Sequence, residues 1–515
     1  MSGTKKLWIL VIVLALIAVL AAGVLWGMTH YVMVNFRFYP QDAQALDLRG
    51  EDISLKDYQK LCRQLPECEI HWDVPFQNGR YPDDTKELTI TSLTDADVKT
   101  LDYLTELETV NAEQCTDYFQ LLALEKRRPE VTVNYSVTLG GTAFAPDTTK
   151  ITVDRISAEE IPLLECLKSL KTVVVSGGED TANFTGLREY CHSHDLNFSV
   201  KLGGKTVAET EKNVRVTNIS DEELNLLQFL PDLKQLHLVK PMASAENLVQ
   251  LRQTRPDVKI TWAQELCGKV FTTEDEEIDL SEATIKSVQE VEQGMAYFPD
   301  AEQVFLGDCG LDNEEIAAYR ERAREDYKVV WIVYCSEKLP TRTDATSFMP
   351  SRDGVGYFKD EWSYNLRYCE DMIAIDVGHM GVKDISFVAY MPNLKYLILA
   401  HTEVTDITPI SNCKNLIFLE LDWSPIADYT PLLGCTALED LNIGKYGADV
   451  TPICKMTWLK NVWCVFRPGA AGKIAQALPN THVVGSGNAT VSSGWRNLPN
   501  YYAMRDALNM YYMKW

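Results

Sequence analysis

The 515-residue sequence lacks the short motifs that commonly mark an active site. There is no H-E-x-x-H, no G-x-S-x-G and no G-x-G-x-x-G, which excludes the local signatures of several large enzyme classes. The segment KLGGKT at 201–206 imitates the end of a phosphate-binding loop, but Ser199 stands where that loop needs its first glycine. The segment CHSHD at 191–195 offers metal-ligand types at a spacing that matches no common zinc site. We therefore expect no catalytic residue, no cofactor and no metal.

Positive charge is also scarce. The chain has 49 Lys+Arg against 73 Asp+Glu, which gives a formal net charge of -24. Such a balance repels the phosphate backbone, and the densest basic run, EKRRPE at 125–130, carries a glutamate at each end. The sequence predicts no nucleic-acid partner.

The thirteen cysteines form no C-x-x-C pair, and none precedes Cys62. A lipid-modified cysteine after the N-terminal apolar segment is thereby excluded. An odd count leaves at least one cysteine unpaired or intermolecular. We expect single buried thiols, because free cysteine packs like a small apolar side chain.

Charge is absent between Lys6 and His30. The apolar range 7–28 makes roughly 33 Å of helix, enough for a hydrocarbon core of about 30 Å. Lys5 and Lys6 precede it, so the positive-inside rule places residues 1–6 in the cytoplasm and the C-terminus outside the cell. We predict a signal-anchor, a single transmembrane helix in the cell membrane. A cleaved signal peptide is the alternative, although its apolar region is usually about 7–15 residues.

A repeated apolar pattern occupies the range 371–466. NLKYLILAHTEVTDITPISNC at 393–413 returns as NLIFLELDWSPIADYTPLLGC at 415–435. The first apolar column runs through 372, 394, 416, 438 and 459, at intervals of 22, 22, 22 and 21. An L-x-x-L-x-L core with a period of about 20–29 is typical of a solenoid, whose single coils cannot bury their apolar residues alone. The sequence predicts an α/β solenoid: a leucine-rich repeat stack of parallel strands with helical or turn return segments.

The repeats resemble those of bacterial internalin-like leucine-rich repeat proteins, which carry the phrase seen here as VTDITPI. The tail GWRNLPNYYAMRDALNMYYMKW and the block RTDATSF resemble uncharacterised membrane-anchored leucine-rich repeat proteins of anaerobic Gram-positive bacteria. The resemblance implies a repeat fold and a surface location. It implies no activity.

Two other residue types keep the repeat spacing. The aspartates are Asp384, Asp406, Asp428 and Asp449. We expect each to accept backbone N–H bonds where the return segment begins, rather than to bind cations. Cys413 and Cys435 also stack one coil apart, and we expect two inward thiols rather than a disulfide.

The range 66–335 repeats at a longer period. Phe76, Leu139, Leu202 and Leu266 stand in one column, at intervals of 63, 63 and 64. Each unit reads as strand, helix, strand, helix, strand, which suggests a divergent solenoid. The glycine pairs that end each unit could instead turn a hairpin that interrupts the stacking. We expect a juxtamembrane linker at 29–65, a connector at 336–370 and a C-terminal cap at 467–515 over the open end of the stack.

The x positions of L-x-x-L-x-L face outward and are free to vary. One outward column holds His379, His401, Trp423, Lys445 and Phe466. Exposed aromatic residues on consecutive strands usually mark a binding surface, unless loops or the aromatic tail cover them. The residues predicted to bind a partner are Tyr396, Ile398, His401, Phe418, Glu420, Asp422, Trp423, Lys445 and Trp463.

These features favour a non-enzymatic, membrane-anchored extracellular protein that binds a protein, or less readily a cell-wall glycan, through its concave strand surface. A structural or scaffold subunit of a membrane complex is one alternative. An enzyme whose active site is assembled from distant positions is another.

Overall fold

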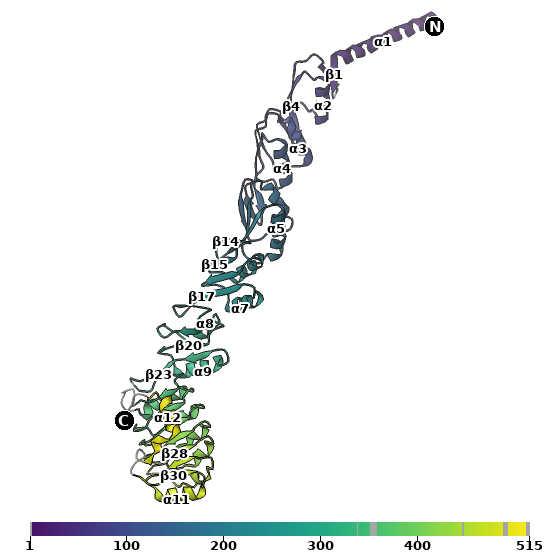
Figure 1. Cartoon of the computed structure of the whole chain (residues 1–515). Helices are drawn as coiled ribbons and strands as arrows, with labels where there is room; N and C mark the ends of the chain where they lie inside the picture. Colours follow the sequence, from purple (N-terminus) through teal and green to yellow (C-terminus); the bar gives the residue numbers. More distant parts are fainter. Residues whose placement is uncertain are drawn as a thin grey trace. The chain divides into compact units, whose positions relative to one another are not determined.

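The structure is a computed structural model that describes residues 3–34, 36–336, 338–350, 358–444, 448–487 and 493–510. The chain divides into two units, Met1–Leu236 and His237–Trp515. Each unit is built from short strands that alternate with helices or turns (Figure 1).

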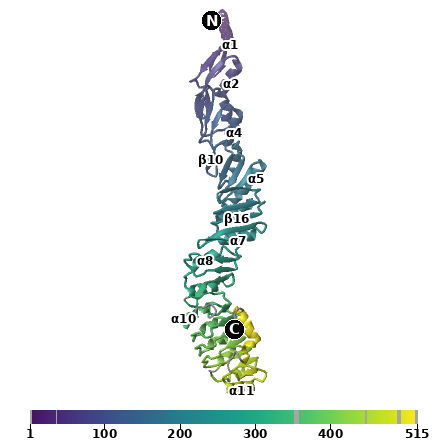
Figure 2. The same ribbon diagram turned by 60° about the vertical axis from the view of Figure 1, so that its left-hand side comes forward.

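Unit 1 begins with a long apolar helix. Within the described residues, one helix is long and apolar enough to cross a membrane, Leu7–Gly27 inside α1. The helices of unit 1 are α1 (Gly3–His30), α2 (Leu55–Gln64), α3 (Asp95–Thr100), α4 (Tyr118–Arg127), α5 (Thr181–Ser193) and α6 (Asp221–Leu224), with 3-10 turns η1 (Leu101–Tyr103), η2 (Ile161–Cys166) and η3 (Asn225–Phe229). Helices α2, α4 and α5 lie along one side of this unit, and β10 lies on the other (Figure 2).

The strands of unit 1 fall into small separate sheets. They are β1 (Tyr31–Val34), β2 (Arg37–Pro40), β3 (Ala45–Leu48), β4 (Glu69–Phe76), β5 (Gly79–Pro82), β6 (Glu87–Thr89), β7 (Thr109–Asn111), β8 (Thr132–Asn134), β9 (Val137–Leu139), β10 (Thr142–Phe144), β11 (Lys150–Val153), β12 (Thr172–Val175), β13 (Asn197–Leu202), β14 (Lys205–Ala208) and β15 (Asn213–Thr217). In the module β11–β14, strands β11, β12 and β13 are parallel, and β14 then pairs antiparallel with β13. The strand, helix, strand, helix, strand order predicted for this unit is confirmed, although its first return segment is the 3-10 turn η2.

The glycine pairs turn hairpins, which decides the alternative that the sequence leaves open. Gly140, Gly141, Gly203 and Gly204 all have positive φ, which glycine adopts without steric cost. A Cβ on Gly203 would lie 2.0 Å from the backbone oxygen of Thr217. Because β14 occupies the edge of β13, the parallel stacking stops there and each module keeps its own sheet.

A glutamate joins each of the hairpins β9–β10 and β13–β14 to the following module. Glu223 accepts hydrogen bonds from the backbone nitrogens of Gly203, at 3.1 Å, and of Ser220, at 3.0 Å. Glu160 makes the same two bonds one module earlier, to Gly140 at 3.1 Å and to Ser157 at 2.8 Å. The acidic segments SAEEI at 157–161 and SDEEL at 220–224 therefore connect neighbouring modules.

Unit 2 contains modules of the same kind and then a continuous sheet. β16 (Gln235–Val239) lies at the unit boundary. The strands that follow are β17 (Lys259–Leu266), β18 (Lys269–Thr272), β19 (Glu277–Asp279), β20 (Gln303–Phe305), β21 (Lys328–Val330), β22 (Ile332–Tyr334) and β23 (Pro340–Arg342). The helices are α7 (Ala245–Thr254), α8 (Val288–Met295), α9 (Asn313–Ala323) and α10 (Asp360–Ser363). Hairpins β17–β18 and β22–β23 are antiparallel, whereas β19, β20 and β21 are parallel.

The C-terminal repeats form one parallel seven-stranded sheet. Its strands are β24 (Ser347–Phe348), β25 (Ala374–Asp376), β26 (Tyr396–Ile398), β27 (Phe418–Glu420), β28 (Asp440–Asn442), β29 (Asn461–Trp463) and β30 (His482–Val484), in this order. The return segments are 3-10 turns, namely η4 (Tyr364–Tyr368), η5 (Ser386–Tyr390), η6 (Thr408–Asn412), η7 (Thr430–Gly434) and η8 (Ile453–Lys455). Leu397, Leu419 and Leu441 stand in register and are fully buried. The leucine-rich repeat solenoid is therefore present.

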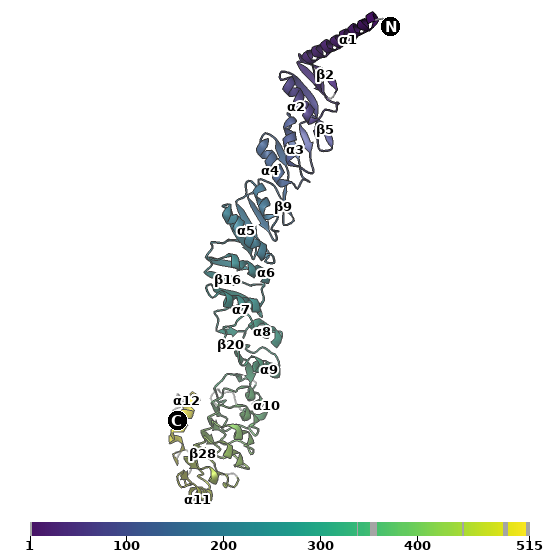
Figure 3. The ribbon, with the colours of Figure 1, turned by 90° about the vertical axis from the view of Figure 1, so that its right-hand side faces the viewer.

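Three regions differ in detail from the expectation. The range 29–65, expected to be a juxtamembrane linker, contains β1, β2, β3 and α2. The range 336–370 contains β23, β24, α10 and η4, and its residues 351–357 lie outside the described residues. Within its described residues, 493–510, the aromatic tail does not cover the open end of the stack. Helix α11 (Pro468–Ala477) packs against β30 at that end, whereas α12 (Pro499–Ala507) folds back along the sheet (Figures 1 and 3).

Candidate binding surface of the C-terminal repeats

The outward face of the C-terminal sheet carries the columns predicted to bind a partner. The register pairs Tyr396 with Phe418 and Phe418 with Asp440. It likewise pairs Ile398 with Glu420, and Asn442 with Trp463. The alternation within each strand is therefore as expected, with leucines inward and these residues outward.

The C-terminal segment covers much of this outward face. Trp495 and Tyr501 pack on Phe418, with ring centroids 4.6 Å and 6.3 Å away. Trp495 also lies 5.4 Å from Trp463, and its indole nitrogen donates to Glu420 Oε2 at 2.8 Å. These residues belong to a second apolar cluster, separate from the core between the coils. From here on, the cap means residues 493–510 alone, the part of the predicted C-terminal cap that covers this outward face.

The cap buries several residues that the sequence predicts to be exposed. Phe418 is 0% exposed and Trp463 is 3% exposed, so the expectation that these two side chains are exposed on the strand surface is wrong, whereas their part in binding a partner stays a prediction. The predicted residues that are buried are Ile398, Phe418, Asp422 and Trp463; those that are half-buried are Tyr396, Glu420 and Trp423; and His401 is exposed. Lys445 lies outside the described residues. The alternative in which the tail covers the patch holds for this part of the face.

Carboxyl groups lie beneath the cap. Burial raises the pKa of Glu420 to about 7, and the negative charges of Asp376 and Asp422 raise it further, although the Trp495 hydrogen bond opposes them. Burial likewise raises the pKa of Asp376 to about 6, against a hydrogen bond from the Gly378 nitrogen. The cap therefore packs more favourably when these carboxyl groups carry protons.

A row of rings remains accessible at the ends of the strands. His379, His401 and Trp423 follow β25, β26 and β27, and Phe466 follows β29. The His379 and His401 rings stack at 4.4 Å with an interplanar angle of 15°, and His401 stacks on Trp423 at 5.4 Å with an angle of 10°. Phe466 meets Trp423 edge-on at 5.7 Å. We call these four residues the ring column.

The backbone explains the alignment of the ring column. His379, His401 and Trp423 share a left-handed conformation, with φ of 62°, 56° and 61°. The nitrogens of His379 and His401 donate to carbonyl oxygens of the next coil, Ala400 and Asp422, both at 2.8 Å. Any residue at these positions would take the same turn, and glycine would take it with the least strain. The backbone therefore does not require rings here.

The packing of the ring column lowers the pKa of one of its residues, His401. Burial lowers the pKa of His401, and the neighbouring His379 lowers it further, because two stacked imidazolium rings repel each other. His401 is therefore neutral at pH 7. His379 and His401 are exposed, Trp423 is half-buried, and Phe466 is 37% exposed.

The repeated aspartates and cysteines have structural roles. Asp384, Asp406 and Asp428 each accept a hydrogen bond at 2.8 Å from the backbone nitrogen two residues later. This Asx-turn starts the return segment, so the expected turn role is confirmed for these three aspartates. The Asp449 carboxylate forms an ion pair with Lys473 at 2.9 Å. Cys413 and Cys435 are buried free thiols, and burial raises their pKa values to about 12 and about 11. The expected inward thiols are confirmed as well.

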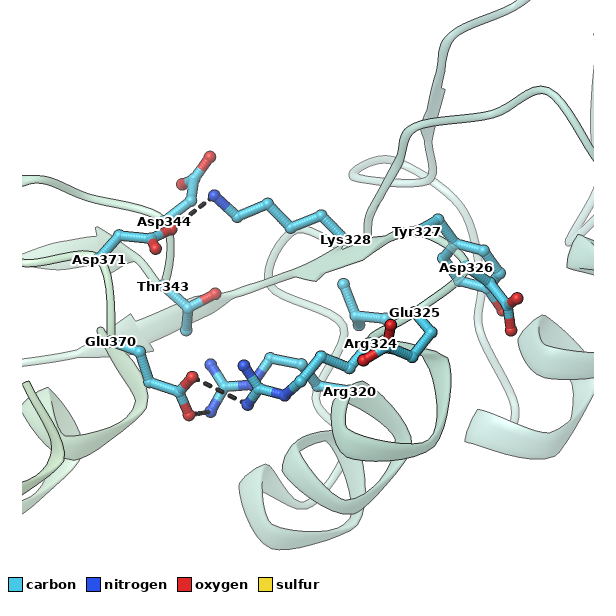
Figure 4. Close-up of a pocket in the computed structure, with 11 residues that line it drawn as sticks. Arg320, Arg324, Glu325, Asp326, Tyr327, Lys328, Thr343, Asp344, Glu370 and Asp371 are labelled. Atoms are coloured by element: carbon cyan, nitrogen blue, oxygen red, sulfur yellow. Dashed lines mark hydrogen bonds and ion pairs between the residues drawn. The ribbon is translucent and has the colours of Figure 1, made fainter. Parts of the chain in front are cut away.

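A charged cavity of about 280 Å³ lies near the start of the repeats (Figure 4). Glu370 binds Arg320 at 2.5 Å and Arg324 at 3.0 Å, and Lys328 binds Asp371 at 2.5 Å. Because these cations are already paired within the protein, the cavity offers little free charge to a ligand. Its ion pairs connect α9 and β21 to the coil that precedes β25.

Comparisons with known proteins identify no family. No protein-family model matches the chain, and no curated protein matches it. Matching solved structures include internalin C2 of Listeria monocytogenes, with 17% identity over 51% of this chain and 86% of that one and a TM-score of 0.20. They also include an internalin of the same species, with 12% identity, coverage of 83% and 89%, and a TM-score of 0.19. A leucine-rich repeat protein of Leptospira interrogans shows 12% identity, coverage of 76% and 93%, and a TM-score of 0.22.

Sequence reasoning predicts part of the site incompletely. His379 and Phe466 stand in the predicted outward column, although they are not among the residues predicted to bind a partner. The contact between Trp495 and Glu420 is also unforeseen, because the tail has no repeat register from which its position could be derived. The only available signal is the tail's high aromatic content.

Proposed function

We propose that the protein is a membrane-anchored extracellular binding protein, whose C-terminal repeats bind a protein partner through the ring column. The observation that carries this proposal is a row of accessible rings at turns whose backbone does not require rings. Aromatic side chains at the centre of an interface often contribute most of its affinity. The ring column lies beside a face that the cap already covers, so it is the accessible part of the predicted surface.

The arrangement favours a protein over a glycan. Sugar rings stack on open aromatic faces, but here the faces of His401 and Trp423 are largely occupied by their neighbours in the column. Ring edges and imidazole nitrogens are left for a partner, and these groups suit backbone and side-chain hydrogen bonds. The net charge of -24 further disfavours nucleic acid.

The anchoring rests on the apolar span Leu7–Gly27 and on its N-terminal flank. We propose residues 1–6 as a cytoplasmic tail, 7–28 as an uncleaved transmembrane helix and the remainder as extracellular, as the wider resemblance to membrane-anchored repeat proteins also implies. Alkaline carbonate extraction should leave the full-length chain in the membrane pellet. Release of a shortened soluble form would contradict the anchoring.

The binding role is tested by Trp423→Ala in the full chain, with Tyr390→Ala as the matched control. Tyr390 is an exposed aromatic residue on η5, outside the ring column. Loss of an interface tryptophan commonly costs about 2 kcal/mol or more of binding free energy. We expect Trp423→Ala to lose partners that the wild type and Tyr390→Ala both capture from a cell-surface extract, with similar melting temperatures for the two variants. A partner set unchanged by Trp423→Ala would contradict the proposal.

A structural subunit of a membrane complex is the second candidate, because the exposed apolar side chains of α1 could pack on other helices. It predicts partners that survive Trp423→Ala and are lost when α1 is replaced by an unrelated transmembrane helix.

A further inference from the structure

The hairpin that follows α1 is apolar on both faces. Val32, Val34 and Tyr39 point inward and are buried. The opposite face carries Met33, 51% exposed, and Phe38, 63% exposed. An antiparallel hairpin with one face on a core normally presents polar side chains to water on its other face. This hairpin does not follow that pattern.

The exposed apolar residues form one patch. Met33 and Phe38 are cross-strand partners, as are Tyr31 and Pro40, and cross-strand partners share a face. Phe36, at the tip of the hairpin, is 92% exposed and has a φ of 60°. We call Tyr31, Met33, Phe36, Phe38 and Pro40 the hairpin patch.

The hairpin patch continues directly from the apolar helix. Helix α1 ends at His30 and β1 begins at Tyr31, so no linker separates them (Figure 1). A cavity of about 830 Å³ lies between α1 and the hairpin. It is lined by Leu20 and Gly23 of α1, by Met33 and Phe38 of the hairpin, and by Lys60 of α2. The medium that surrounds the C-terminal end of α1 therefore also contacts the hairpin patch.

Basic residues lie beside the patch in an otherwise acidic protein. Lys56, Lys60 and Arg63 of α2 follow helical spacing and are exposed, so they share one side of the helix. Lys60 Nζ donates to the backbone oxygen of Met33 at 2.9 Å, which places this side of α2 next to the hairpin. Cations beside exposed aromatic residues match the interface of a bilayer that contains anionic lipid.

We propose that the hairpin patch lies in the interfacial zone of the bilayer that α1 spans, with its rings among the upper acyl chains and the basic side of α2 facing anionic headgroups. This inference rests on the proposed anchoring. In this arrangement the first module contacts the membrane surface directly, so its orientation relative to the bilayer is fixed.

The test places a photo-crosslinking residue, p-benzoylphenylalanine, at single positions of the full chain in vesicles of phosphatidylcholine and phosphatidylglycerol. Positions 36 and 38 report on the patch. Leu14, exposed on α1, reports on anchoring, and Phe119, an exposed aromatic residue on α4, is the matched control. Burial of one phenyl ring in an apolar medium favours the buried position by about tenfold or more. We expect lipid adducts at 36 and 38 to exceed those at Phe119 by about this factor.

The outcomes separate the inference from the anchoring. Lipid adducts at Leu14 and at both patch positions, with little at Phe119, support the inference. Adducts at Leu14 without adducts at Phe36 and Phe38 overturn it and leave the anchoring intact. An absence of adducts at Leu14 overturns both. Crosslinks between two chains at 36 or 38 would instead assign the patch to self-association.

A second arm tests the contribution of charge. The double variant Lys56→Gln, Arg63→Gln leaves the Lys60 hydrogen bond in place. With the label at position 38, adduct yield should fall in this variant toward the yield that the wild type shows in vesicles of phosphatidylcholine alone. An equal yield in the two vesicle types for the wild type would overturn the proposed role of anionic headgroups.

Discussion

The modules of unit 1 and the C-terminal repeats use nearly the same chain length per strand but build different sheets. In the module β11–β14, the third strand extends to Leu202 and turns back through Gly203 and Gly204. In the C-terminal repeats the strands are short and are followed by a return turn, so every edge stays open for the next parallel strand. The comparison shows that the residues after a strand, and not the repeat period, decide whether a solenoid sheet continues.

Equivalent leucine-to-alanine substitutions should destabilise a different number of neighbouring strands in the two regions. Leu419→Ala and Leu202→Ala each remove a fully buried leucine from a strand, and each should lower the free energy of unfolding by about 2–5 kcal/mol. In the continuous sheet, hydrogen exchange should accelerate from β24 through β30. In the module, acceleration should be confined to β11–β14. Faster hydrogen exchange that extends over equally many strands in both regions would contradict the comparison.

The hairpin glycine provides a sharper test within a module. Gly203→Ala places a Cβ against the Thr217 oxygen and strains a left-handed residue, which should cost about 1–3 kcal/mol. Gly204→Ala is the matched control, because Gly204 has a positive φ of 80° but no atom near its Cβ position. Chemical denaturation should rank Gly203→Ala as the more destabilising. The reverse order would mean that the turn relaxes at little cost.

Substitutions in the turns of the C-terminal repeats should lower the free energy of unfolding by less than Gly203→Ala does. Asp406→Ala removes one Asx-turn and should cost about 1 kcal/mol, similar to the loss of a helix cap. Asp406→Asn, which can still accept the hydrogen bond, is the control. A metal-dependent effect, or a loss as large as that of Leu419→Ala, would contradict the structural role of the aspartates.

The stability of the face covered by the cap should depend on pH, in contrast to that of the modules. The pKa of Glu420 rises from 4.5 to about 7 on folding, so the folded state binds more protons between these values and stability falls as pH rises through that window. Asp376 acts in the same direction, between 3.8 and about 6. The melting temperature of Glu420→Gln should therefore depend less on pH in this window. An unchanged pH profile would mean that the cap leaves Glu420 solvated.

The sequence predicts those parts of the molecule that recur. The leucine columns, the Asx-turns and the thiols follow from spacing, because stacked coils must repeat their core and their turns. The hairpins remain one of two alternatives, since a glycine pair suits either a turn or a break. The cap does not follow from the sequence, because Trp495 and Tyr501 contact strands far away in the chain and repeat nothing. For this reason the burial of Phe418 and Trp463 is missed, while His401 and Trp423 are placed correctly outside the core.

Hydroxyl-radical footprinting of the full chain, with tryptophan oxidation quantified by mass spectrometry, tests the central claim most directly. The claim is that the cap occupies the outward face and leaves the ring column accessible. It predicts rapid oxidation of Trp423 and slow oxidation of Trp463 and Trp495. Oxidation of Trp463 at the rate of Trp423 would contradict the account. It would mean that the whole outward face of the strands is accessible to a partner.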